Sequence, residues 1–264
     1  MHAEAQTTAD SIAIAEARWQ ETPVARGMKG RVAAFESLYG GPQYVSIVEV
    51  KPHRKYRADI GVSSEMKTIS QLAREHQAVT AINGSYYNMS KGNSVCFLKK
   101  GSVVLDSTIA SEFPLRVTGA VKVRRGKLRI LSWNKPIELN YHKRRGTVLA
   151  SGPLMLRDGE EADWSGCDSS FIHTKHPRSA IVLKKGGRVL LVTVDGRSKG
   201  NAVGMSIPEL AHLAKSLGGR KALNLDGGGS TMLYLEGQIL NHPSDNKLFD
   251  HAGERSIPNI IYFR

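Results

Sequence analysis

Residues 189–231 read VLLVTVDGRSKGNAVGMSIPELAHLAKSLGGRKALNLDGGGST. Two short apolar runs in this stretch, Val189–Val194 and Ala222–Leu225, have the character of buried strands. Between them, Ser206-Ile207-Pro208-Glu209 has the form of a capping box, and an apolar stripe follows it as far as Gly218. The stretch therefore predicts a strand, a helix over 207–217 and a second strand parallel to the first, which together resemble a βαβ crossover.

Both predicted strands end at an aspartate that is followed by glycine. The first continues as Asp195-Gly196-Arg197 and the second as Asp226-Gly227-Gly228. Parallel strands of one sheet send their following loops to the same edge, where such sheets bind ligands. We therefore expect Asp195 and Asp226 to meet in one pocket.

Three consecutive glycines, Gly227 to Gly229, stand directly after the second aspartate. Glycines in a strand cost conformational entropy and provide no side chain for packing. A single glycine would be enough for a tight turn or bulge. Three favour a backbone that approaches a ligand closely, and successive exposed N–H groups form a concave anion site.

Elsewhere the chain alternates short β-rich runs with glycine turns. Hairpins are predicted around Gly101, Gly126, Gly186-Gly187 and Gly237, and helices over about 7–21 and from Thr68 to near His76. The expected class is α+β, with a mixed, hairpin-rich β-sheet, a few packing helices and one βαβ-like crossover over residues 189–225. We expect residues 1–75 to be an N-terminal extension packed on the core, and residues 76–264 to form the main domain.

Composition limits the classes of function. The chain has 264 residues and a formal net charge of +13, and nine Lys or Arg but only one acid, Glu138, lie between Val121 and Arg145. Such a run is most often a solvated face, but it can also attract an anionic polymer. No nucleic-acid-binding motif is present, so no nucleic-acid partner is expected. The two cysteines, Cys96 and Cys167, make neither a disulfide framework nor a zinc site, and no apolar stretch is long enough for a transmembrane segment.

Several other residues carry candidate chemistry. Paired carboxylates such as Asp195 and Asp226 suit glycosyl transfer, and they also suit Ca²⁺ or Mg²⁺. Arginine forks match phosphate oxygens, so His176-Pro177-Arg178 and Arg197 favour an anionic group beside the carboxylates. Two tyrosines after Asn83-Gly84-Ser85 can form a sugar platform. For Glu254-Arg255, a plain ion pair on the surface and a role in the site are equal alternatives.

The chain resembles the phosphodiester glycosidase family over roughly residues 76–264. The resemblance rests on motifs that occur in the family's order: Ala81-Ile82-Asn83-Gly84, Ser151-Gly152-Pro153-Leu154, His176-Pro177-Arg178, Val194-Asp195-Gly196-Arg197, Gly204 to Leu210, Asn224 to Thr231, and Glu254-Arg255. It implies an enzyme that hydrolyses a carbohydrate phosphodiester, similar to an α-N-acetylglucosaminyl phosphodiester, at the anomeric C–O bond. The chain is also similar to exported bacterial proteins that act on cell-envelope or host glycans.

This reading assigns a role to each candidate residue. The catalytic set is Asp226, Asp195, Glu254 and His176, with one carboxylate as nucleophile or base. The substrate-binding set is Arg178, Arg197, Asn83, Gly84, Asn224, Gly227, Gly228, Gly229, Ser230 and Thr231. Asp195 and Asp226 are the metal ligands if Ca²⁺ or Mg²⁺ is needed. Three alternatives stay open: a non-catalytic glycan- or phosphate-binding module, a serine hydrolase that uses Ser230, and a nucleic-acid binder that uses residues 121–145.

Overall fold

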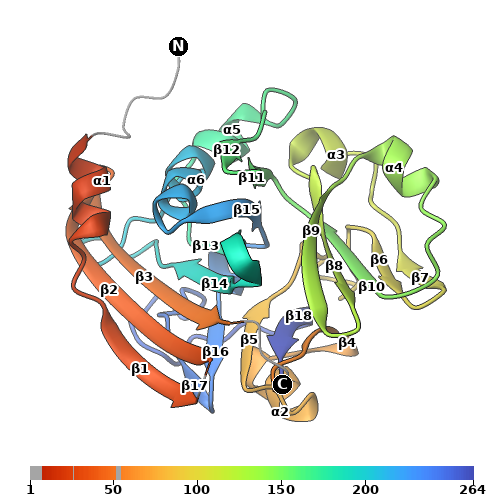
Figure 1. Cartoon of the computed structure of the whole chain (residues 1–264), viewed down its shortest axis with the longest axis horizontal. Coiled ribbons are helices and arrows are strands. Elements are labelled where there is room, and N and C mark those ends of the chain that lie inside the picture. The colour runs from red at the N-terminus through yellow and green to blue at the C-terminus, as the bar shows by residue number, and fades with distance from the viewer. Residues whose placement is uncertain (1–7, 26, 52–54) are drawn as a thin grey trace.

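The computed structural model describes residues 8–25, 27–51 and 55–264. Its framework is three antiparallel sheets (Figure 1). The eight-stranded sheet has the order β1 (Gln20–Ala25), β2 (Met28–Leu38), β3 (Gly41–Val50), β14 (Val189–Val194), β13 (Arg178–Lys184), β15 (Gly219–Asn224), β11 (Leu154–Arg157) and β12 (Glu160–Glu161).

Two five-stranded sheets complete the framework. The β8 sheet has the order β7 (Val103–Asp106), β6 (Leu98–Lys100), β10 (Thr147–Ser151), β8 (Gly119–Arg124) and β9 (Lys127–Ser132). The β18 sheet has the order β17 (Gln238–Ile239), β16 (Leu233–Leu235), β5 (Thr80–Asn83), β18 (Ile257–Phe263) and β4 (Ala58–Lys67).

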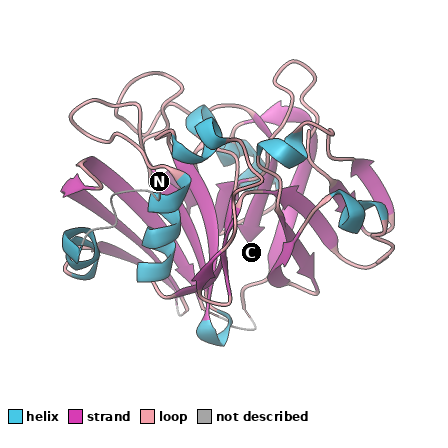
Figure 2. Cartoon of the chain, turned by 90° about the horizontal axis from the view of Figure 1, so that it is seen from above, coloured by secondary structure: helices cyan, strands magenta, loops and turns pink. Residues whose placement is uncertain are grey.

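Short helices lie around the strands (Figure 2). They are α1 (Thr8–Ala15), α2 (Ile69–Glu75), α3 (Glu112–Leu115), α4 (Lys135–Leu139), α5 (Ser169–His173) and α6 (Ile207–Ser216). None of the helices within the described residues is both long and apolar enough to cross a membrane.

One apolar core joins the three sheets. Leu191 of the eight-stranded sheet, Val121 of the β8 sheet and Ile261 of the β18 sheet are fully buried in the same cluster. The other face of the eight-stranded sheet is covered by α6, whose Leu210 and Leu213 share a second cluster with strand residues. Side chains on alternate strand positions point to opposite faces, so the all-buried β14 contributes to both clusters. The sheet is therefore covered on both sides around β14.

The predicted crossover is present, with one strand between its two ends. Residue Ile181 of β13 pairs antiparallel with Leu191 of β14 on one side and with Leu223 of β15 on the other. The strands β14 and β15 therefore run parallel but are not hydrogen-bonded neighbours. The expected mixed sheet was therefore wrong: all pairings among the described strands are antiparallel. The reason is that β13, the first strand of the β13–β14 hairpin, lies between β14 and β15. The α+β class and the common edge for the two following loops are confirmed.

Local signals in the sequence correspond closely to local structure. Thr68 and Ser206 both form capping boxes, at the starts of α2 and α6. The four predicted hairpins are the pairs β6–β7, β8–β9, β13–β14 and β16–β17. The cysteines Cys96 and Cys167 are both free thiols, and Cys96 is buried.

The prediction of a helix over about 7–21 was too long, and its first residue lies outside the described residues. Helix α1 ends at Ala15, and Gln20 begins strand β1, which pairs with β2. The Trp19 ring packs edge-on against Phe35, and the Arg31 guanidinium lies 4.8 Å from its centre. Packing on the sheet therefore overrides the helical spacing that includes Trp19.

Strands from the predicted N-terminal extension belong to two of the sheets. Val50 of β3 pairs with Val189 of β14, and Ala58 of β4 pairs with Phe263 of β18. The boundary at residue 75 stays a prediction.

Replacing Ser206 by alanine tests the capping of α6. Ser206 accepts a hydrogen bond from the Glu209 N–H, and the Glu209 carboxylate accepts one from the Ser206 N–H. We expect Ser206→Ala to lower the free energy of unfolding by about 1 kcal/mol in chemical denaturation. Ser216→Ala, at the exposed last residue of the same helix, is the control and should change it by less than about 0.5 kcal/mol. Equal effects of the two variants would contradict this role for the cap.

Candidate functional site

The glycine loop, residues 226–231, begins where β15 ends and is held by the loop that follows β5. The Asp226 N–H donates to the Gly84 carbonyl at 3.1 Å, and the Asn83 side-chain amide donates to the Asp226 carbonyl at 2.7 Å. The Asn83 side-chain oxygen accepts from the Ser179 hydroxyl at 2.6 Å and from the Met232 N–H at 3.2 Å. Asn83 therefore ties the glycine loop to β13 as well as to β5.

Gly84 is needed for a close approach of two chains. Its N–H donates to the Asn259 carbonyl at 3.0 Å, and a methyl group at Gly84 would overlap the Asn259 side chain. This tight contact fixes the position of the neighbouring Asn83.

The three glycines of the loop lie against different neighbours: the backbone at Gly227, and the ends of arginine side chains at Gly228 and Gly229. A methyl group at Gly227 would lie 2.6 Å from the Pro177 carbonyl oxygen. One at Gly228, whose φ is +59°, would lie 2.8 Å from an Arg197 guanidinium nitrogen, and one at Gly229 would lie 2.5 Å from an Arg255 guanidinium nitrogen. The glycines therefore let two cationic side chains rest against the backbone of the loop.

The Asp226 carboxylate lies in a mostly buried, cationic environment. Its Oδ1 accepts the Gly227 N–H at 2.9 Å. Burial raises the pKa of the Asp226 carboxyl group, while the Ser230 hydroxyl and the charges of Arg116 and Arg255 act in the opposite direction. A carboxyl group with a raised pKa, beside fixed cations, can act as a nucleophile or exchange a proton.

Asp195 is engaged by a different segment of the chain. Its side chain is almost fully buried and accepts hydrogen bonds from the Asn241 amide at 3.2 Å, the His242 N–H at 2.9 Å and the His242 ring at 2.8 Å. Burial raises the pKa of Asp195, against these hydrogen bonds from His242 and Asn241. Asn241 also donates to the Thr231 carbonyl at 2.9 Å. The structure thus connects Asp195 to the glycine loop through Asn241, and a direct carboxylate pair stays a prediction.

The imidazole of His242 is fixed between neighbouring rings. It stacks on Phe249 with ring centres 3.8 Å apart and on His251 at 4.4 Å, and Tyr44 meets it edge-on. Since Asp195 holds its Nδ1, the other ring nitrogen is the one available for further contact.

The two arginines predicted to hold the anionic group have different surroundings. Arg178 is 2% exposed, and its guanidinium donates to the carbonyls of Met205, Phe171 and Thr174 at 2.8 to 3.0 Å. Burial lowers its pKa to about 10. Arg197 is exposed, with φ at +61°, and no carboxylate of the described chain forms an ion pair with it. Arg197 is therefore available to an external anion, whereas Arg178 is occupied by backbone oxygens.

His176 and Glu254 are held by local contacts. The His176 main chain pairs with Met205, and burial together with the charges of Arg178 and Arg197 lowers the pKa of its imidazole. The Glu254 carboxylate accepts from the N–H and the hydroxyl of Ser70, in the first turn of α2, at 2.9 and 2.8 Å. In this structure, Glu254 thus satisfies one backbone N–H and one hydroxyl at the start of that helix.

The remaining predicted binding side chains, Asn224, Ser230 and Thr231, are buried. Asn224 is fully buried, and its amide donates to the Tyr86 hydroxyl and the Gly152 carbonyl, both at 2.8 Å. Tyr86 is only 3% exposed, and the Arg116 guanidinium lies 3.5 Å from its ring centre. Of the two tyrosines expected to form a sugar platform, Tyr86 does not present an open ring, because other side chains cover it. Tyr87 is half-buried, and its hydroxyl donates to the Ser256 carbonyl at 3.1 Å.

Three residues near the site carried no signal in the sequence. Arg116 contributes positive charge near Asp226, and Asn241 and His242 hold Asp195. Arg116 belongs to no recognisable motif, and it pairs with Glu112 one helical turn before it. Only folding brings these residues to the glycine loop.

A dedicated metal centre has no obvious ligand set in the described part of the chain. No group of three or more His, Cys, Asp or Glu side chains there could hold a metal ion. Both oxygens of Asp195 accept N–H hydrogen bonds. We therefore derive no step that passes through Ca²⁺ or Mg²⁺.

Stability as a function of pH separates the roles of the two aspartates. A carboxyl group whose folded-state pKa is raised gives its full contribution to stability below the unfolded-state pKa, and this is lost as pH rises through the folded-state pKa. Asp226→Asn removes that loss and can keep the bond from the Gly227 N–H. In thermal unfolding we therefore expect a higher midpoint for Asp226→Asn than for wild type at pH 7, with the difference vanishing towards pH 3. The gain amounts to about 1.4 kcal/mol for each unit of raised pKa.

Asp195→Asn is the matched substitution at the other strand end. Asparagine has one acceptor oxygen, whereas the two oxygens of Asp195 accept from Asn241 and from His242. At least one of these donors is left unpaired, so we expect a smaller gain in midpoint at pH 7 than for Asp226→Asn. A midpoint for Asp226→Asn at or below the wild-type value at pH 7 would contradict the proposed cost of ionising Asp226.

The chain is similar to known proteins over about two thirds of its length. A prophage-derived uncharacterised protein, YomE of Bacillus subtilis, is 27% identical over 188 residues, which cover 69% of this chain and 28% of that protein. Human N-acetylglucosamine-1-phosphodiester α-N-acetylglucosaminidase is 25% identical over 192 residues, which cover 68% of this chain and 36% of the enzyme. The chain thus spans about a third of the length of the curated relatives that it matches.

The fold has a counterpart among solved structures. The catalytic domain of zebrafish N-acetylglucosamine-1-phosphodiester α-N-acetylglucosaminidase matches with a TM-score of 0.69 and 18% identity, over 93% of this chain and 87% of that domain. The profile of the phosphodiester glycosidase family matches residues 76–264, which include the whole glycine loop, and the chain belongs to this family.

Proposed function

We propose that this protein hydrolyses a sugar-1-phosphodiester at the anomeric C–O bond, with a substrate similar to the α-N-acetylglucosaminyl phosphodiester named for its human relative. The observation that carries the proposal is the close packing of the Arg197 and Arg255 guanidiniums on Gly228 and Gly229, directly after Asp226. A carboxylate and two cationic side chains thus meet at one short loop, which suits a charged sugar phosphate. The expected cradle of glycine N–H groups does not contribute, because the Gly227 N–H donates to Asp226 and the Gly228 N–H to Pro177.

Arg197 is the main candidate for contact with the phosphate group. It is exposed and has no carboxylate partner among the described residues, whereas the Arg255 guanidinium is paired with Asp245. The lowered pKa of His176 keeps its imidazole neutral near Arg197 at pH 7, so it can donate or accept a hydrogen bond there. The geometry favours Arg197 over Arg178, because the Arg178 guanidinium is already used by three carbonyls.

The chemistry of the leaving group explains why the reaction could proceed with few catalytic residues. Hydrolysis joins a water oxygen to the anomeric carbon, and the electron pair of the broken C–O bond leaves with a phosphate monoester. The second pKa of such a monoester is about 6, so it departs without strong help from a general acid. The site then mainly needs a group that attacks or activates water and cations that stabilise the departing charge.

We assign the reacting carboxylate to Asp226, as nucleophile or as the base that takes the proton from water. Asp195 becomes a positioning residue, because His242 and Asn241 occupy its oxygens. Glu254, which accepts from Ser70, positions α2 against the site.

Two buried oxygens, one at the end of β15 and one in the glycine loop, favour a polar occupant close by. Neither Asn224 Oδ1 nor Thr231 Oγ1 has a hydrogen-bond partner among the described residues. An unpaired buried polar atom costs about 1–3 kcal/mol, so such atoms are normally satisfied by water or ligand. Asn224, Ser230 and Thr231 are therefore our candidates for holding an ordered water or a sugar hydroxyl.

We place the activity outside the cytoplasm, where phosphodiester-linked sugars of cell envelopes or host glycans are found. Fractionation of the producing cell with an antibody against this chain tests that placement, and recovery only with cytosolic markers would overturn it. The competing function is a binding module without turnover.

Kinetics on α- and β-N-acetylglucosamine-1-phosphodiesters of a simple alcohol test the reaction, with and without chelator. We expect Asp226→Asn to lower kcat by about 10³-fold or more, because it removes the only group assigned to attack or water activation. We expect Arg197→Ala to lower kcat/KM by about 10- to 100-fold, the value of a charge-assisted hydrogen bond.

Lys199→Ala is the control, since Lys199 is an exposed cation in the same loop as Arg197. It should leave kcat/KM within about twofold of wild type. Calorimetric binding of these diesters without any hydrolysis would support the binding module instead, and an unchanged rate for Asp226→Asn would remove Asp226 from the chemistry.

A further inference from the structure

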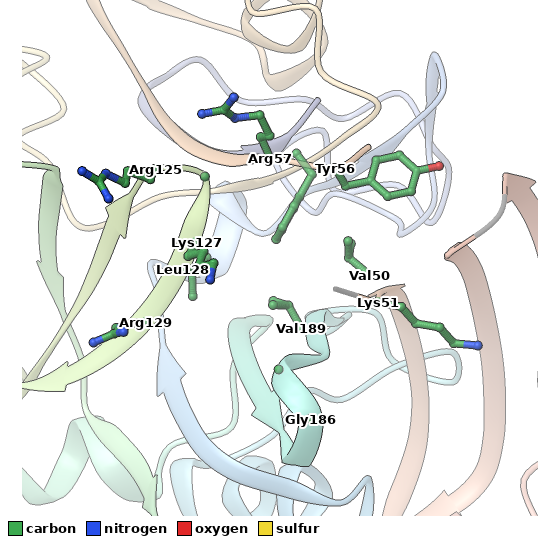
Figure 3. Close-up of a pocket in the computed structure, with 13 residues that line it drawn as sticks. Val50, Lys51, Tyr56, Arg57, Arg125, Lys127, Leu128, Arg129, Gly186 and Val189 are labelled. Carbon is green, nitrogen blue, oxygen red and sulfur yellow. The ribbon is translucent and has the colours of Figure 1, made fainter. Parts of the chain in front are cut away.

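A cavity of about 660 Å³ (Figure 3) lies at the ends of the central strands that are opposite to the ends followed by Asp195 and the glycine loop. It is lined by Val189, where β14 begins, and by Val50, where the neighbouring β3 ends. Asp195 follows the other end of β14, six residues along the strand. A strand rises about 3.3 Å per residue, so roughly 20 Å separate the cavity from that end. The cavity is therefore distinct from the candidate active site.

The lining of this cavity is strongly basic. Lys51, Arg57, Arg125, Lys127 and Arg129 contribute to it, and no acidic residue does. None of these five side chains forms an ion pair with a carboxylate of the described chain. Their charges are thus left for solvent ions or for a ligand.

Two further hollows adjoin the cavity and share Arg125 with it. One, of about 480 Å³, adds Lys122, Arg124 and Lys143, and the other, of about 470 Å³, adds Arg145 and Arg264. The only acid that lines either hollow is Asp59. In Figure 3, Arg125, Lys127 and Arg129 follow the β8–β9 hairpin, with Gly186 and Val189 across the cavity from them. Cations therefore continue from one hollow to the next along this hairpin.

The hairpin places like charges directly opposite one another. Lys122 pairs in register with Arg129, and Arg124 pairs with Lys127. Like charges in such cross-strand positions destabilise a sheet. The neighbouring charges of Arg124 and Arg129 add to burial in lowering the pKa of Lys122. An anion bound along the hairpin would relieve this repulsion.

The lining favours a flexible polyanion over a nucleic acid or a membrane surface. Its two aromatic residues, Tyr56 and Phe263, are 6% and 4% exposed, so they offer no face on which bases could stack. None of the exposed large apolar side chains of the described chain lines the three hollows, so there is no group to insert into a bilayer. Concave hollows in series suit a chain that can bend into them, and arginine forks match phosphate oxygens.

We propose that this basic face, formed by the β8–β9 hairpin and the three hollows along it, is a binding site for a flexible polymer of closely spaced phosphate groups. The site is separate from the glycine loop, and its occupation is measured without turnover. The basic face would hold an anionic polymer at one end of the central strands, while the other end, with the glycine loop, remains free.

Fluorescence anisotropy with labelled inorganic polyphosphate tests the proposal on the full chain. At about 50 mM salt we expect Arg125→Glu, Lys127→Glu and Arg129→Glu together to weaken binding at least 100-fold. The slope of log affinity against log salt should also fall by about 2, by analogy with the roughly 0.7 per phosphate contact of single-stranded nucleic acids. The same three residues changed to Gln should weaken binding at least 10-fold, which keeps the test valid if the reversed variant fails to fold.

The control changes net charge by the same amount elsewhere. Arg18→Glu, Arg74→Glu and Lys91→Glu alter three exposed cations outside the three hollows, and together they should weaken polyphosphate binding less than threefold. Equal losses in the two reversed variants would mean attraction to overall charge only and would overturn the site. Tighter binding to a thymidine oligonucleotide of equal charge, or to vesicles rich in phosphatidylserine, would overturn the choice of ligand.

Discussion

The buried side-chain amide of Asn83 holds together the region on which the candidate site depends. It bonds to the Asp226 carbonyl, the Ser179 hydroxyl and the Met232 N–H, and so joins β5, β13 and the glycine loop where two sheets meet. A buried amide with both ends satisfied permits little displacement, since any shift would leave a polar group unpaired. The position of the Asp226 backbone follows from this arrangement.

The glycine loop lowers the stability of the folded chain but lets neighbouring groups approach its backbone closely. Three glycines lose more backbone entropy on folding than other residues would, and the raised pKa of Asp226 means that its ionised form is held at a cost. Burial of apolar side chains in the core shared by the three sheets, and in the second core beneath α6, offsets these unfavourable free energies. This combination of a well-packed scaffold and a glycine-rich, charged loop is typical of sites that act on ligands rather than of turns that only connect strands.

The two ends of the central strands in the eight-stranded sheet differ in how their charges are compensated. At one end Asp195 and Asp226 follow β14 and β15, and cationic side chains are placed singly around them. At the other end, the basic face continues along the β8–β9 hairpin with almost no compensating acid. Much of the net charge of +13 is therefore a local property of one surface.

Short-range patterns in the chain were enough to predict the caps of α2 and α6, the four glycine hairpins and the common edge of the two aspartate loops. Each depends on residues a few positions apart, or on strand direction, which a connecting helix constrains. The family resemblance likewise came from contiguous motifs and is confirmed over residues 76–264. The partners of the charged groups were decided by the tertiary structure. Asp195 meets His242, Glu254 meets Ser70, and Arg178 meets the carbonyl of Met205. These contacts join segments 27 to 184 residues apart, so no local pattern encodes them.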